Sequence, residues 1–211
     1  MRNKKMIPVI SWGVMVLLVI VLSVYSMAYF IPGMPFSFRP EVYPQSPLTI
    51  FLLAHIGGAV VAALCGPLQF CQSFRLRNIK THRLLGKCYL LGVLVAGVSA
   101  LIISPISQGG LVTHIGFALL AVSWLVATFI AYKRILERDW LAHQRWMIRS
   151  YSLTLAFVSL RIWLGGLVLT GAPFEEVYQT VAWICWVPNL MIAEYCINRN
   201  NSLVARAVVL R

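Results

Sequence analysis

The sequence predicts an all-α integral membrane protein with six transmembrane helices, the central four of which form a four-helix bundle. The first observation is composition, since 60% of the 211 residues are hydrophobic and only 11% are charged. The second is a mean hydropathy of +0.80. A soluble domain of this length has too little interior to hide so much apolar surface, so lipid must be the main solvent of the chain.

Six apolar runs account for the predicted helices, because each can cross about 30 Å of hydrocarbon. They cover about residues 8–31, 48–72, 82–104, 111–133, 143–169 and 178–197. The first run follows MRNKK and is interpreted as a retained span, because it is too long for a signal peptide and lacks a small-residue cleavage site. The proline-rich segment 32–47 is expected to be the longest outer loop. No polar stretch is long enough to fold alone, which predicts one membrane domain over residues 1–211.

The net charge of +12 is distributed in short basic clusters between the apolar runs. Such clusters are topology signals that attract anionic lipid, so no nucleic-acid partner is expected. The loop after the second run, the loop around residues 133–138 and the C-terminal tail are basic, whereas the loop 170–177 carries Glu175 and Glu176. The positive-inside rule therefore predicts that both termini are cytoplasmic. The cysteines are Cys65, Cys71, Cys88, Cys185 and Cys196, and no disulfide framework is expected among them.

The chain has only four histidines, His55, His82, His114 and His143, and each falls in a different central helix. Under the predicted topology, His55 lies about two turns and His114 about one turn below the outer ends of the second and fourth helices. His82 and His143 lie at the cytoplasmic starts of the third and fifth helices. The second and fourth helices thus supply an outer pair of imidazoles, and the third and fifth supply an inner pair.

Two imidazoles at one depth are typical of a haem iron site. Alternate helices of an antiparallel bundle face each other diagonally, so each pair predicts a bis-histidine haem b site. A flat macrocycle needs room between helices, and the residues around the histidines at helical spacing are small. They are Gly58, Ala59, Ala62 and Gly66 below His55, Ala118 and Ala121 below His114, and Gly86 beside His82. We therefore expect Gly58, Gly66 and Gly86 to line the haems.

Arginines within the spans add a second line of evidence. Arg161 follows His143 by five helical turns, so we expect it on the same face, roughly 27 Å outward, at the level of the outer pair. A guanidinium in a span costs at least about 2.5 kcal/mol unless it is paired, and a haem propionate is a bidentate partner. Arg83 and Arg149 would serve the inner haem in the same way. For Glu194, an ion pair with Arg149 is favoured over a proton-carrying role beside a quinone or ion pathway.

Each of these features also has a simpler interpretation. Interfacial histidines are commonly polar anchors, and small residues in membrane helices usually contact another helix. A transporter or metal-handling protein would use the histidines to bind copper or zinc or to relay protons. A non-catalytic membrane scaffold would not need them. One histidine in each central helix, at two matched depths, favours haem over these alternatives.

Four stretches resemble a bacterial family of predicted multi-pass membrane proteins of unknown function. They are GPLQF (66–70), HRLLGKCYL (82–90), HQRWMIRSYSLTLAFVSLRI (143–162) and WVPNLMIAE (186–194), and the resemblance covers about residues 50–197. It implies a multi-pass protein of the bacterial inner (plasma) membrane but no established activity.

The layout is also similar to cytochrome b561, the six-helix di-haem ferric or ascorbate-linked reductases. That resemblance implies a transmembrane oxidoreductase in which His55 and His114 hold the outer haem and His82 and His143 the inner one. The electron donor would be a quinol or an ascorbate-like reductant. The acceptor would be ferric iron, a partner protein or a quinone. Donor, acceptor and direction of flow are left open, and so is a homodimer.

Overall fold

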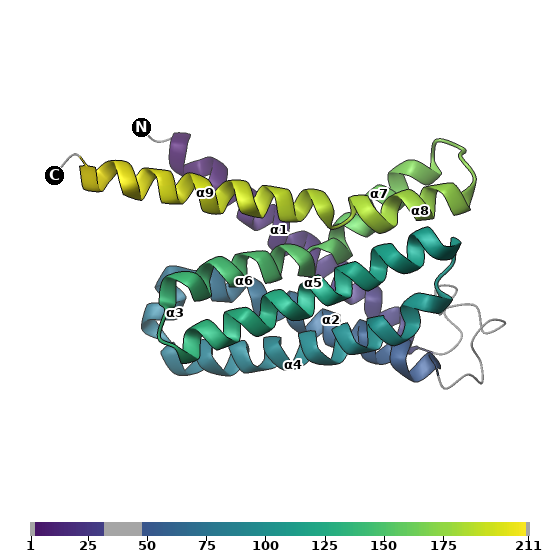
Figure 1. Ribbon diagram of the computed structural model, residues 1–211, viewed down its shortest axis with the longest axis horizontal. Helices are drawn as coiled ribbons and strands as arrows, with labels where there is room; N and C mark the ends of the chain where they lie inside the picture. Colours follow the sequence, from purple (N-terminus) through teal and green to yellow (C-terminus); the bar gives the residue numbers. More distant parts are fainter. Residues whose placement is uncertain (1–2, 32–47, 210–211) are drawn as a thin grey trace. The chain divides into compact units, whose positions relative to one another are not determined.

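The computed structural model describes residues 3–31 and 48–209, and within these ranges every regular element is a helix (Figure 1). Six stretches are long and apolar enough to cross a membrane. They are Ser11–Phe30, Leu48–Phe70, Ile79–Ile106, Gly110–Leu136, Trp140–Val168 and Phe174–Arg199. The predicted all-α class with six helices able to span a membrane is confirmed, while the central four-helix bundle and the cytoplasmic position of both termini stay predictions. The segment 32–47, which we expected to form an outer loop, lies outside the described residues.

The chain divides into two compact units, Met1–Ile103 and Ser104–Arg211, which are described separately. The single membrane domain expected over residues 1–211 therefore stays a prediction. The helices of the first unit are α1 (Asn3–Met27), η1 (Ala28–Phe30), α2 (Leu48–Phe70), α3 (Gln72–Arg77) and α4 (Ile79–Ile103). Those of the second are η2 (Ser104–Ile106), α5 (Gly110–Leu136), α6 (Trp140–Thr154), α7 (Ala156–Val168), α8 (Phe174–Ile184) and α9 (Val187–Val209).

The core of the first unit is an antiparallel hairpin of α2 and α4, with α1 packed on α2. Gly58 lies against Gly92 and Ala96, and Gly92 lies against Gly58 and Ala62, so the two helices run in opposite directions. Small side chains let the two backbones approach closely, which is how helices associate in lipid without a hydrophobic driving force.

The turn of this hairpin is held by hydrogen bonds. Cys71 adopts an extended conformation between α2 and the short helix α3. Buried Gln69 donates from Nε2 to the carbonyl of His82 at 3.3 Å, which ties the end of α2 to the start of α4. The orientation of the first turn of α4 is therefore set by the end of α2.

In the second unit, α5 packs on α6 and α8, α7 packs on α8, and α6 packs on α9. Trp124 Nε1 on α5 donates to Thr154 Oγ1 on α6 at 3.0 Å, and Thr128 Oγ1 lies 2.6 Å from Ser150 Oγ. This ladder of buried polar side chains joins the two helices within the apolar core. At the turn between them, Asp139 Oδ1 accepts from the Ala142 amide at 3.0 Å and caps α6.

The last two spans are each interrupted near the middle (Figure 1). We expected one continuous helix over 143–169, but Leu155 separates α6 from α7, and its carbonyl accepts from both the Val158 and Ser159 amides. Cys185 and Trp186 separate α8 from α9, and Pro188 follows two residues after Trp186. Proline cannot donate the usual backbone hydrogen bond, which explains the second break. The first has no proline or glycine beside it.

Candidate functional site

His55 of α2 bonds to the facing helix of its own unit. Its Nδ1 lies 2.9 Å from the carbonyl oxygen of Ala96 on α4. A carbonyl only accepts, so Nδ1 carries the ring proton and the lone pair of the neutral ring is on Nε2. Metal-binding histidines usually have this arrangement, in which the second ring nitrogen donates to a backbone carbonyl. The same bond also joins α2 to α4.

The small residues below His55 do not all face an open groove. A Cβ added to Gly58 would come within 2.7 Å of the Gly92 carbonyl oxygen and 3.0 Å of the Ala96 nitrogen. We expected a porphyrin against Gly58, but α4 occupies that space. Ala62 and Gly66 are buried as well. At Gly86, in contrast, an added Cβ would have nothing within 4 Å.

His143 of α6 resembles His55 in its bonding. Its Nδ1 lies 2.8 Å from the carbonyl oxygen of Ala131, near the end of α5. Here too Nδ1 is the donor and Nε2 holds the lone pair. In both hairpins, therefore, a histidine within two turns of a helix start reaches a carbonyl near the end of the antiparallel partner helix.

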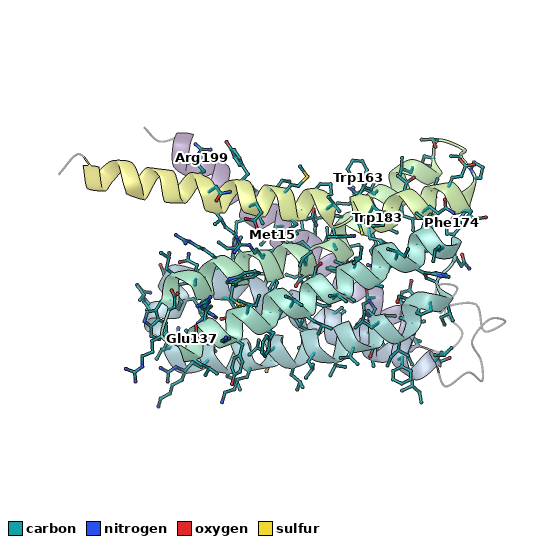
Figure 2. The ribbon with its side chains drawn as sticks, in the orientation of Figure 1. Met15, Glu137, Trp163, Phe174, Trp183 and Arg199 are labelled. Carbon is teal, nitrogen blue, oxygen red and sulfur yellow. The ribbon has the colours of Figure 1, made fainter. Side chains whose placement is uncertain are left out.

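His114 uses its other ring nitrogen. Its Nε2 lies 2.8 Å from the carbonyl oxygen of Ser107, in the turn that precedes α5. The same turn receives Gln179 Nε2, which donates to the Gly109 carbonyl at 2.9 Å, while Trp183 Nε1 donates to the Val112 carbonyl at 3.3 Å. His114 thus belongs to a group of side chains that holds the start of α5 against α8, on which Phe174 and Trp183 are labelled in Figure 2.

The fourth histidine, His82, is half-buried in the first turn of α4. His55 and His82 belong to the first unit, and His114 and His143 belong to the second. The pairs expected at each haem join residues of different units, and they stay predictions. Within the described residues, no three His, Cys, Asp or Glu side chains are grouped as ligands for a bare metal ion. All five cysteines, which the structure describes, are free thiols.

Arg149 forms the ion pair that we favoured for Glu194. The Arg149 Nε lies 2.5 Å from Glu194 Oε1 and Nη2 lies 2.9 Å from Oε2, which is a bidentate geometry. The guanidinium also lies 4.5 Å from the centroid of the Trp146 ring. In the described structure this guanidinium is bound by a carboxylate of the chain itself, and the propionate role expected for it stays a prediction.

Two other arginines were expected near haem. Arg161 on α7 donates from Nη1 to the Phe157 carbonyl at 2.9 Å, and its guanidinium lies 5.1 Å from the centroid of the Phe157 ring. The break at Leu155 lies between His143 and Arg161, so the two no longer share a face by counting turns of one helix. Arg83 is exposed on α4, on a face that it shares with Lys80 and Lys87.

Asn189 links the two interrupted spans. Its Nδ2 donates to the Cys185 carbonyl at 3.1 Å and to the Ser152 carbonyl at 3.3 Å. Its Oδ1 accepts from Ser159 Oγ at 3.1 Å. In the sequence, Asn189 is recognisable only as a polar residue within a span. Its partners Ser152 and Ser159 lie on either side of the break at Leu155. No proline or glycine marks that break, so the sequence does not show the role of Asn189.

Replacing Asn189 by leucine should lower the free energy of unfolding by about 2 kcal/mol, because three hydrogen bonds within a membrane helix bundle are lost at once. The measurement is an SDS titration of the detergent-solubilised protein, followed by circular dichroism. Asn198→Leu, at an exposed position of the same helix, should change the free energy of unfolding by less than about 0.5 kcal/mol. Equal effects of the two changes would show that Asn189 does not hold the two breaks together.

The length and apolarity of these helices, with so few charges among them, define a multi-pass membrane protein. The chain belongs to a family described as "Predicted membrane protein (DUF2306)", whose model matches residues 52–197. The matched range includes all four histidines, Asn189 and the Arg149–Glu194 pair. The family has no known function. No curated protein and no solved structure gives a significant match, and the likeness to cytochrome b561 stays a prediction.

Proposed function

We propose that this protein is a membrane cytochrome that binds haem b through its histidines and transfers electrons across the bilayer. The observation that supports the proposal is the ring orientation of His55 and His143, whose Nδ1 atoms both face backbone carbonyls. That hydrogen bond fixes the ring, sets the tautomer and makes Nε2 a stronger ligand. Two histidines in separate hairpins have this bond, which is common among metal-binding histidines.

The hydrogen bonds of His55 and His143 fit ligation of haem iron through Nε2. The hydrogen bond of His114 does not fit it unless that bond changes. Because His114 Nε2 donates to Ser107, its lone pair is on Nδ1, so it would bind iron through Nδ1 or release the Ser107 carbonyl. We propose the pairs that the sequence predicts, His55 with His114 and His82 with His143. A bound haem b would supply one-electron redox chemistry at a potential set by its ligands and by burial.

In this proposal the rest of the chain holds the ligating imidazoles in place and keeps water away from them. The bonds to Ala96 and Ala131 hold two imidazoles at helix–helix contacts, and the apolar helices around them exclude water. Arg161, which lies within the fifth span, is the arginine that we propose for a propionate. We also propose a bacterial inner membrane as the location, a quinol or an ascorbate-like reductant as donor, and ferric iron, a partner protein or a quinone as acceptor.

The same hydrogen bonds also favour a second candidate, a membrane scaffold in which the histidines only join helices. His55 joins α2 to α4, His143 joins α5 to α6, and His114 holds the turn before α5. Asparagine separates the two candidates, because its Nδ2 occupies the position of histidine Nδ1 and can donate to the same carbonyl, while it offers no Nε2.

The test is a reduced-minus-oxidised difference spectrum of detergent-purified protein from haem-replete cells, with haem and protein both quantified. The wild-type protein should show the sharp bands of low-spin haem. His55→Asn and His143→Asn should each lower the haem content to about half, because each removes one ligand of a different haem. After haem has been removed from all three proteins, their thermal unfolding temperatures should differ little, because the bonds to Ala96 and Ala131 are kept.

Colourless wild-type protein would overturn the proposal. If that protein carried zinc or copper by elemental analysis, the metal-handling alternative would hold instead. If His55→Asn and His143→Asn kept full haem content, the ligands would be other residues. A scaffold predicts no haem in any variant and a lower unfolding temperature for His143→Ala, which breaks the bond to Ala131, than for His143→Asn.

A further inference from the structure

Three cations lie along one face of α4, close to its start. Lys80, Arg83 and Lys87 are three and four residues apart, a spacing that places them on one side of a helix. All three are exposed. Leu84 and Leu91 lie on the same face and are 61% and 62% exposed. We call these five residues the α4 basic stripe. Along α4 the stripe runs from Lys80 and Arg83 through Leu84 and Lys87 to Leu91.

Among the described residues of the first unit, no carboxylate neutralises the stripe. Residues 3–31 and 48–103, the described part of this unit, contain no Asp or Glu. The basic turn between α5 and α6 is different, because Glu137 lies 3.8 Å from Lys133 Nζ and 2.9 Å from Arg134 Nη1. Glu137 is labelled at this turn in Figure 2. The charge of the α4 basic stripe therefore has no acidic partner among residues 3–31 and 48–103 of its own unit.

The stripe is held in place before any ligand arrives. Gln69 ties the end of α2 to the His82 carbonyl, within the stripe's first turn. The Asn78 amide donates to the Phe74 carbonyl at 2.9 Å and the Asn78 carbonyl accepts from the His82 amide at 2.9 Å, so the joint between α3 and α4 is hydrogen-bonded from both sides. A site built on α4 thus has little backbone to order on binding.

We propose that the α4 basic stripe binds an anionic phospholipid, with its phosphate at Lys80, Arg83 and Lys87 and an acyl chain along Leu84 and Leu91. Lys87 lies about 12 Å along α4 from its first residue, so its ammonium must extend toward the surface, where lipid phosphates lie. A ligand that is anionic at one end and apolar at the other complements both halves of the stripe. In this proposal Arg83 binds the lipid phosphate and not a haem propionate, so the lipid site does not depend on haem.

The test is native mass spectrometry of the full chain in detergent, titrated with phosphatidylglycerol or phosphatidylcholine. The variant Lys80→Gln/Arg83→Gln/Lys87→Gln removes the stripe cations. The control Lys133→Gln/Arg134→Gln/Arg138→Gln removes the same number of charges beside Glu137. Wild-type protein and the control should retain phosphatidylglycerol, and the stripe variant should bind it about 100-fold more weakly, since each cation near a membrane surface contributes about 1 kcal/mol. Phosphatidylcholine should bind all three proteins equally weakly.

Equal losses in the two triple variants would overturn the proposal, because they would show an effect of net charge alone. Equal retention of phosphatidylcholine and phosphatidylglycerol would also overturn it. Displacement of the lipid by an equal concentration of inorganic phosphate would indicate an anion site without a lipid component. If the triple variant does not fold, as judged by circular dichroism, Lys87→Gln alone should weaken binding about fivefold, and an unchanged affinity would be decisive against the stripe.

Discussion

Replacing Glu194 by glutamine is expected to lower the free energy of unfolding by about 2 kcal/mol. Arg149 would keep its charge but lose the negative charge of its partner and one of the two oxygen acceptors, with only 20% of its side chain exposed. Breaking a fully buried pair costs about 3–5 kcal/mol, and the 40% exposure of Glu194 reduces this figure. The measurement is an SDS titration of the detergent-solubilised protein followed by circular dichroism.

A double variant distinguishes a broken ion pair from a lost packing contact. Arg149→Met/Glu194→Met removes both charges, so it should recover at least half of the stability lost in Glu194→Gln. Glu137→Gln is the control, because Glu137 also pairs with an arginine, Arg134, but that arginine is 44% exposed against 20% for Arg149. The loss of this exposed pair should cost less than about 1 kcal/mol. A double variant that is less stable than Glu194→Gln would contradict a role for the charge pair.

Replacing Gly92 by alanine is expected to destabilise the first unit by about 1–3 kcal/mol, the usual cost of overpacking. The added Cβ would come within 2.7 Å of the Gly58 carbonyl oxygen and 3.2 Å of the Ala62 nitrogen. Both are backbone atoms of α2, so neither can move aside unless the helices separate. The same titration measures the change.

Gly86→Ala on the same helix is the matched control, and it should change the free energy of unfolding in the opposite direction. Its Cβ would have nothing within 4 Å, so the change only replaces a poor helix former by a good one. We expect a gain of about 0.5–1 kcal/mol. If both glycine variants lost stability equally, the close contact between α2 and α4 would not be the cause.

The small residues show how far sequence could go in locating the site. Small side chains below His55 fitted either a cofactor or a second helix, because both need a backbone without bulky neighbours. At Gly58 the tertiary structure places α4 in that space. Gly86 has the same residue type and spacing beside His82 but no such neighbour. Whether a cofactor or a second helix lies beside a glycine depends on a distant part of the chain. The spacing of residues within one helix does not contain that information.

The interrupted spans show the same limit for the fold. A proline such as Pro188 marks a kink in the sequence because it removes a backbone donor, and the break between α8 and α9 ends two residues before it. The break at Leu155 has no proline or glycine beside it in the sequence. Its nearby Ser152 carbonyl accepts from Asn189, which lies on another helix. Similarly, Thr128 and Ser150 are unremarkable in sequence and become partners only when α5 packs on α6.

The sequence by itself determined the solvent of this protein, the number of apolar spans, the single histidine in each central helix and the ion-pair partner of Arg149. These follow from local composition and helical spacing, which act within one segment. Only the tertiary structure decided which ring nitrogen of each histidine donates, where the last two spans break, and that α4 lies against Gly58. These depend on atoms from distant segments, because a hydrogen bond or a close contact needs both of its partners in place.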